Sequence, residues 1–323
     1  MASRARAPPS ASRCPWWPSE SRSREQAGHF GRTQESGERD KSVNKLASGA
    51  YASTEYPGVN VGFVVVPGGA VAIDAPTLPA DAKAWRRRIT ETAGGPILYV
   101  VVTDGHPDRL LSVGLMKAPV VGSLAAYERA AKLTEGSWRA AAERWIRRFP
   151  QAAKALNEPA IALPEIILVS RLMLHRGDQV LSIETVPGAA PGSVWVHLPE
   201  RNVLFAGDTV VIGTHPPMEA TPDTKAWLDT LKGLRRPAHS KTTIVPGRGP
   251  ISQQAATRPL SDYVALLRRR ARSLRGDAQT GMAAAVADLM DAFPVGHNDH
   301  DAHEKQVRAN LERACRVAEQ ASN

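Results

Sequence analysis

Three side chains that could perform chemistry stand two residues apart in the segment Thr103–Arg109. Asp104, His106 and Asp108 follow an apolar run, Tyr99–Val102, that breaks off abruptly into a stretch containing Gly and Pro. Such a run is typical of a buried strand. If the loop after this strand stays extended, alternation directs all three side chains to one side. Two carboxylates and an imidazole could then form a metal site or an acid–base site, and a polar turn with a helix cap is the alternative.

Three later segments repeat this pattern of an apolar strand that ends in charged or flexible residues. They are the small-residue loop Val186–Ser193, the segment Leu204–Asp208, which ends in Gly-Asp, and Ile244–Pro250, in which glycines flank Arg248. Each is a weak signal by itself, because Gly-Asp and Pro-Gly are common in turns. Four such segments in one chain are much more specific and indicate a site at the strand ends.

The strands and helices that must position these segments follow a mixed α/β order. Short β-rich runs alternate with helical patterns before and after a helical stretch at about residues 124–160, and the two β-rich halves are similar in order. This order favours a two-sheet sandwich with outer helices. We expect a disordered basic tail over residues 1–48, the sandwich over 49–256 with 124–160 as an insertion that could cap the site, and helices packed on the same domain over 257–323.

Composition excludes several classes of protein. The chain has 323 residues, a formal charge of +9 and two cysteines, Cys14 and Cys315, near its opposite ends. The cysteines predict no disulfide framework and no cysteine-based zinc site, which fits a cytoplasmic protein. No apolar run approaches the roughly 18 residues of a membrane span. The positive charge would permit nucleic acid as a partner, but no nucleic-acid-binding motif accompanies it, so a solvated helix face is the expected role of the late arginines.

From about Tyr51 to Gln320 the sequence resembles the metallo-β-lactamase superfamily, an αββα sandwich of mainly zinc-dependent hydrolases. Members carry H-x-H-x-D-H after a central strand, where this sequence has Asp104-Gly-His106-Pro-Asp108-Arg109. They carry G-H-T-P-G-S, where this sequence has Gly188-Ala-Ala-Pro-Gly-Ser193. The F-x-G-D strand end is matched by Phe205–Asp208, and P-G-H-G corresponds to Pro246-Gly-Arg-Gly249. The resemblance implies an αββα fold with its active site at these strand ends.

The departures from the family motifs fall on the metal ligands. The resemblance implies that the first metal would lie at Asp104, His106 and Ala189, and the second at Asp108, Arg109, Asp208 and Arg248. Alanine cannot ligate, and a guanidinium stays protonated and offers no lone pair. We therefore predict a pocket without cofactor, in which Arg109 and Arg248 replace the metals as counter-charges to the acidic residues. The alternative is a single divalent metal on Asp104, His106 and Asp208, with oxygen-rich ligation that favours a harder ion than zinc.

Two classes of function remain open on this basis. The resemblance implies hydrolysis of an ester, thioester, lactone or phosphoester, in which Asp108 and His106 would act as general base and partner. Arg109 or Arg248 would then hold an oxyanion or an anionic substrate. In the second class, the protein is a pseudoenzyme that binds a small anionic molecule through the same two arginines. A plain structural role for Asp108 and His106, as an ion-pair partner and a hydrogen-bonding residue, is compatible with both.

Overall fold

The computed structural model describes residues 41–218, 220–274, 281–293, 295 and 300–320. The first 40 residues of the predicted tail lie outside this part of the chain. Residues Asn44–Ala47, which the predicted tail included, form strand β1, and this strand pairs with β2 (Ala50–Ser53). With one aliphatic side chain larger than alanine, Leu46, the β1 sequence has no apolar alternation that would reveal a strand.

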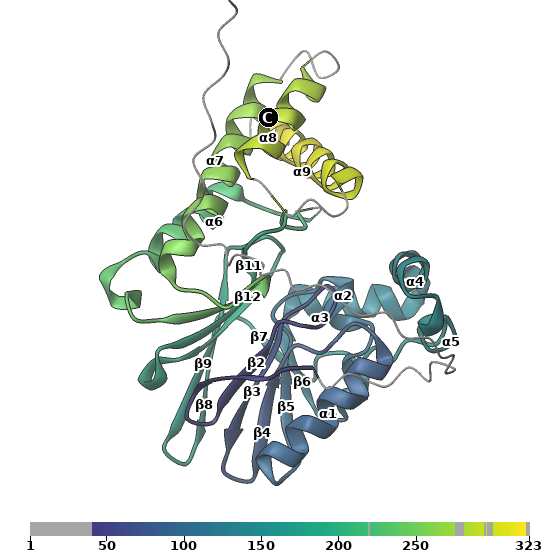
Figure 1. Cartoon of the computed structure of the whole chain (residues 1–323), viewed down its shortest axis with the longest axis vertical. Coiled ribbons are helices and arrows are strands. Elements are labelled where there is room, and N and C mark those ends of the chain that lie inside the picture. The colour runs from purple at the N-terminus through teal and green to yellow at the C-terminus, as the bar shows by residue number, and fades with distance from the viewer. Residues whose placement is uncertain (1–40, 219, 275–280, 294, 296–299, 321–323) are drawn as a thin grey trace, which may run out of the picture. The chain divides into compact units, whose positions relative to one another are not determined.

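The described chain folds into two sheets that lie face to face (Figure 1). In the first sheet, β1 to β4 are antiparallel and β4 to β7 run parallel. Its strands after β2 are β3 (Val61–Val66), β4 (Gly69–Ile73), β5 (Ile97–Val101), β6 (Val120–Ser123) and β7 (Ile166–Leu168). The second sheet has the order β12-β11-β10-β9-β8, with β11 and β12 parallel and the other pairs antiparallel. Its strands are β8 (Arg171–Arg176), β9 (Gln179–Val186), β10 (Ser193–Leu198), β11 (Val203–Val211) and β12 (Thr243–Arg248).

Three buried clusters hold the layers together. Aliphatic side chains such as Val71 and Val101 from the first sheet meet Ile183 and Val196 from the second in the central core. On the outer face of the first sheet, helix α1 (Pro79–Ala93) buries Trp85 and Ile89. On the outer face of the second sheet, α6 (Thr224–Leu234) and α7 (Arg258–Ser273) cover β10 and β11. The predicted αββα sandwich is therefore confirmed.

The helical stretch between β6 and β7 runs from Leu124 to Leu156. It contains α3 (Leu124–Lys132), η2 (Leu133–Ser137), α4 (Trp138–Arg148), η3 (Pro150–Ala152) and α5 (Ala153–Leu156). Trp145 of α4 packs with Leu78, Leu111 and Leu156 in a small separate cluster. Ser123 begins α3 as its N-cap, because its hydroxyl accepts a hydrogen bond from the backbone N–H of Ala126.

The C-terminal helices pack on the same sandwich. They are α7, α8 (Met282–Ala292) and α9 (His300–Gln320), and Val307 and Leu311 of α9 lie in one cluster with Leu204 and Val210 of β11. Among the described residues, the helices are too short or too polar to cross a bilayer. The remaining short helices are α2 (Pro107–Leu110), η1 (Val113–Met116), η4 (Pro199–Arg201), η5 (Pro237–His239) and η6 (Gln254–Thr257).

Candidate functional site

Three strand ends and one position inside a fourth strand bring acidic residues and Arg248 to one edge of the sandwich. Asp74 follows β4 directly, Asp104 lies three residues beyond the end of β5, and Arg248 ends β12 beside β11. Asp208 lies inside β11, which is longer than the sequence suggested. Gly247 permits the close approach of β12, because a Cβ there would overlap the Asp208 carboxylate. The glycine of the Pro-Gly-Arg-Gly segment thus lets Arg248 reach the site.

Arg109 lies at the centre of the acidic cluster. Its guanidinium donates from Nη1 and Nη2 to the two carboxylate oxygens of Asp208 at 3.1 and 2.8 Å. The Nε–H is shared between Asp74 Oδ2 at 3.1 Å and Thr103 Oγ1 at 2.9 Å. The side chain is 0% exposed, and the three carboxylates of Asp74, Asp104 and Asp208 raise the pKa of Arg109 against the effect of burial. The residue is a buried counter-charge to three carboxylates, and its side chain has no exposed surface.

Arg248 completes a second set of ion pairs on the outer side of Asp208. Its Nη2 lies 3.2 Å from Asp208 Oδ2 and 3.2 Å from Asp108 Oδ2, and its Nε also donates to Asp208. Burial alone would raise the pKa of Asp208, but Arg109 and Arg248 lower it to about 2. Asp208 is therefore an ionised carboxylate held between two guanidinium groups.

Asp108 connects this centre to the helical insertion. Its Oδ1 accepts hydrogen bonds from Arg144 Nη2 at 2.6 Å and from Trp145 Nε1 at 2.7 Å, and its Oδ2 faces Arg248. Burial would raise the pKa of Asp108, but contacts with His106, Arg248 and Arg144 hold it well below its usual range. One carboxylate thus joins α2, α4 and β12.

His106 caps the short helix α2. The loop does not stay extended, since α2 begins at Pro107, and His106 Nδ1 accepts a hydrogen bond from the backbone N–H of Asp108 at 3.2 Å. A nitrogen that accepts carries no proton, so we assign the proton of the neutral ring to Nε2. Burial lowers the pKa of His106, although Asp108 opposes the shift. In the neutral form of the ring His106 can donate through Nε2, while its Nδ1 lies 3.4 Å from Asp108 Oδ2.

Asp104 and Asp74 lie behind these groups. Asp104 Oδ1 accepts a hydrogen bond from the backbone N–H of His106, whereas Oδ2 has no hydrogen-bond partner within the described chain and lies 3.6 Å from Arg109 Nε. Burial raises the pKa of both carboxyl groups, and Arg109 opposes the shift in each case. Asp104, Asp208 and Arg109 thus form a buried layer beneath the site and are not part of its surface.

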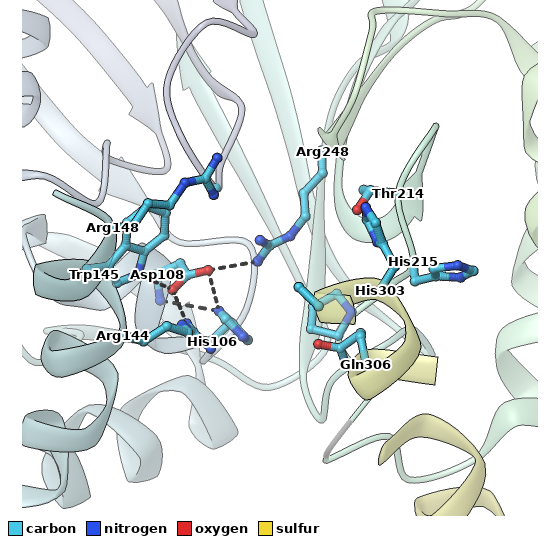
Figure 2. Close-up of a pocket in the computed structure, with 13 residues that line it drawn as sticks. His106, Asp108, Arg144, Trp145, Arg148, Thr214, His215, Arg248, His303 and Gln306 are labelled. Carbon is cyan, nitrogen blue, oxygen red and sulfur yellow. Dashed lines mark hydrogen bonds and ion pairs between the residues drawn. The ribbon is translucent and has the colours of Figure 1, made fainter. Parts of the chain in front are cut away.

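A cavity of about 490 Å³, here called the arginine cavity, opens above this buried layer of side chains. Of the predicted site residues, His106, Asp108 and Arg248 line it. Figure 2 shows two groups of side chains on opposite sides of Arg248: His106, Asp108, Arg144, Trp145 and Arg148 on one, and Thr214, His215, His303 and Gln306 on the other. The insertion and the C-terminal helix α9 therefore both contribute walls.

Sequence reasoning missed most of these wall residues. Arg144 and Arg148 stand four residues apart, so they share one face of α4. This spacing, in an insertion expected to cap the site, was the one sequence signal that could have identified them as wall residues. His215 is 3% exposed, and neither of its ring nitrogens has a hydrogen-bond partner in the described chain. Burial lowers its pKa to about 4, with a further contribution from His303. No local sequence pattern identifies His215 or His303 as site residues, because they reach the cavity from different parts of the chain.

Within the part of the chain that the structure describes, His, Cys, Asp and Glu side chains form no group of three or more suited to a metal ion. The carboxylates that converge at the site are directed at guanidinium groups.

Comparisons with known proteins identify the fold. Among solved structures, a metallo-beta-lactamase from Pontibacter korlensis is 21% identical with a TM-score of 0.55, and the match covers 70% of this chain and 99% of that one. A beta-lactamase domain protein from Burkholderia ambifaria is 16% identical with a TM-score of 0.61, covering 87% and 88%. A metallo-beta-lactamase family protein from Thermus thermophilus is 18% identical with a TM-score of 0.60, covering 86% and 95%. These likenesses show a shared fold.

No curated protein matches the chain significantly. A sequence model of the metallo-beta-lactamase superfamily matches residues 56–248, which include both sheets from β3 onward and the strand-end segments as far as Arg248. This match confirms the resemblance seen in the sequence motifs. The chain belongs to the metallo-beta-lactamase superfamily.

Proposed function

We propose that the protein binds a small anionic molecule in the arginine cavity, and that it does so without a metal ion. The observation that carries this proposal is the pairing of Asp208 with both Arg109 and Arg248. These arginines stand at two metal-ligand positions of the family motifs. Their guanidinium groups supply the positive charge that metal ions supply in related hydrolases.

The donor set does not fit a metal ion. Zinc takes about three protein ligands with free lone pairs and keeps an open position for water. Both oxygens of Asp208 accept hydrogen bonds from guanidinium groups, His106 Nδ1 accepts a backbone N–H, and Ala189 has no donor atom. Two permanent cations beside Asp208 would also repel a metal ion. The same argument weighs against a single metal on Asp104, His106 and Asp208.

The cavity offers positive groups to an anion. Arg248 is 18% exposed, and its Nη1 donates no hydrogen bond to a described residue. The Arg144 side chain is 51% exposed while it contacts Asp108. Arg148 is exposed and makes no ion pair within the described residues. His106 adds a neutral Nε2–H donor beside them, so a carboxylate or phosphate in this cavity would meet donors from three elements.

Hydrolysis by His106 and Asp108 receives weaker support. A general base must take up a proton near neutral pH. Asp108 has a strongly lowered pKa and accepts hydrogen bonds on both oxygens, which disfavours protonation. His106 uses its proton-accepting nitrogen on the backbone of α2. Both residues are better suited to binding than to proton transfer.

Metal content tests the first half of the proposal. We expect protein that is purified without a metal-affinity tag to contain far less than one zinc, manganese or iron ion per chain by elemental analysis. One bound ion per chain, lost together with function in an Asp208→Ala variant, would establish the metal-dependent hydrolase instead.

Anion binding tests the second half. We expect organic carboxylates and phosphates to raise the melting temperature, and Arg148→Gln to weaken their binding about ten-fold, because a charge-assisted hydrogen bond is lost. The matched control is Arg147→Gln, an exposed arginine on α4 that does not line the cavity. Equal affinity of both variants, or turnover of activated esters at an enzymatic rate, would reject a binding role.

A further inference from the structure

A second cavity, of about 610 Å³, adjoins the arginine cavity. The two share His106, Arg144 and Pro217 in their linings, so these three side chains form the boundary between two neighbouring cavities. This volume lies within the range of cavities that hold small organic molecules. We call the second space the alanine cavity.

Small apolar side chains, most of them from the insertion and from the loop after β9, form much of the wall of the alanine cavity. Its described lining includes Ala125, Ala140, Ala141, Ala189, Ala190 and Ala220. Charged residues of α3, Glu128, Arg129 and Lys132, also line it. Methyl groups leave space and offer no hydrogen bonds, so such a wall favours an apolar group over a polar one.

Ala189 shows how the two cavities are related. It is 1% exposed and stands where the family motif carries a metal-binding histidine. Replacement of an imidazole by a methyl group removes a polar ligand and leaves an apolar wall beside His106. Ala189 thus presents a methyl group, with no polar atom, at the wall of the alanine cavity.

We propose that the ligand of this protein is an amphipathic anion, with its charged head among Arg144, Arg148 and Arg248 and its apolar arm along the alanine cavity. This inference rests on the proposed anion-binding function and names the class of ligand. Arg144 is the boundary, because it lines both cavities and its half-exposed guanidinium contacts Asp108. The head group would contact Arg144 from the side of Arg248, and the arm would leave toward Ala140 and Ala190.

A series of straight-chain carboxylates tests the inference. Butanoate, hexanoate, octanoate and decanoate are titrated below their micelle-forming concentrations, and the dissociation constants are compared. We expect affinity to rise about four-fold for each added methylene that enters the cavity, as burial of a methylene predicts. The rise should stop when the cavity is filled.

Two variants locate the apolar arm. Ala140 is an exposed residue of α4 that lines the alanine cavity, so Ala140→Trp places an indole in that space. We expect this variant to reduce the ratio of decanoate to butanoate affinity at least ten-fold. Ala80→Trp makes the same change at an exposed position of α1 outside both cavities and is expected to leave the ratio unchanged. Ala125→Leu fills the cavity from α3 and is a second variant if Ala140→Trp does not fold.

The outcomes separate the inference from the proposed function. If Arg148→Gln weakens butanoate binding but chain length has no effect, the anion site stands and the amphipathic ligand is rejected. If chain length matters but neither cavity-filling variant alters it, the arm lies elsewhere and the inference also fails. If Arg148→Gln and Arg147→Gln bind butanoate equally, the proposed function itself fails.

Discussion

The guanidinium of Arg109 is fully buried and makes ion pairs with Asp74 and Asp208 through three nitrogens. A buried ion pair contributes little relative to a well-packed apolar pair, but removal of one partner leaves an uncompensated charge in the interior. If Arg109 were removed, Asp208 would still pair with Arg248. Asp74 would then retain only its hydrogen bond with Thr103 among these contacts. At the scale of single residues, the stability of the site therefore depends on Arg109.

We expect Arg109→Met to lower the free energy of unfolding by about 3–5 kcal/mol in urea denaturation at pH 7, because buried carboxylates lose their counter-charge. The loss should shrink as the pH falls, since protonation then removes the uncompensated negative charge. Arg109→Lys keeps the charge but loses the bidentate contact, so a smaller loss is expected. Arg269→Met, at an exposed position of α7, is the control. A loss near zero for Arg109→Met at pH 7 would show that the acidic residues are neutral in the folded protein.

At the scale of elements, Asp108 holds the helical insertion against the sandwich. Its two oxygens contact Arg144 and Trp145 of α4 and Arg248 of β12. The helix otherwise packs through a small cluster around Trp145 and through Trp138, which lies against the buried cluster under α1. The position of α4, which carries wall residues of both cavities, is therefore coupled to the charge of a single carboxylate.

We expect Asp108→Asn to accelerate amide hydrogen exchange in α4 about ten-fold, because two charge-assisted hydrogen bonds are weakened. Exchange in β5 and β11 should change little, since the sheet hydrogen bonds are untouched. Asp229→Asn on α6, which removes an exposed carboxylate, is the matched control. Uniformly faster exchange across the sheets would mean that Asp108 supports the whole fold rather than the insertion.

At the scale of the whole molecule, His215 joins the sandwich to the C-terminal helices. Its ring centre lies 5.2 Å from that of Tyr263 in α7, 5.5 Å from that of Phe293 and 5.5 Å from that of His303 in α9. Burial lowers the pKa of His215 to about 4. The folded protein thus keeps this ring neutral at pH values at which the unfolded chain protonates it.

This difference predicts a pH dependence of stability. Between about pH 6.5 and 4 the unfolded chain binds more protons at His215, so the free energy of unfolding decreases as the pH falls, by about 3 kcal/mol at most. Asp74 and Asp104 have raised pKa values, so their protonation makes the free energy of unfolding increase as the pH falls. The contribution of His215 is therefore measured as the difference between the pH profiles of a His215 variant and the wild type. We expect His215→Gln to flatten the dependence in this window and His300→Gln, at an exposed position of α9, to leave it unchanged. Equal pH profiles for His215→Gln and the wild type would refute the role of His215.

Most elements of the fold could be predicted because their signals are local. The runs Val61–Val66 and Ser193–Leu198 are strongly apolar, and Asp223 caps α6 as its sequence position suggests. Strand β1, which the sequence did not reveal, and the short helices α2 and η1 have weak local patterns. Pairing with β2 stabilises β1, and such pairing is a tertiary effect.

The sequence by itself determined the location of the site and the residues that replace the family's metal ligands, because motif positions and chemical types are local properties. Only the tertiary structure decided which of these residues a ligand can touch. Arg109 and Arg248 are alike in sequence, yet one is enclosed by carboxylates and the other faces the cavity. Arg148 and His215 enter the same cavity from α4 and from the segment after β11. The physical reason is that burial and charge pairing depend on contacts between segments far apart in the chain.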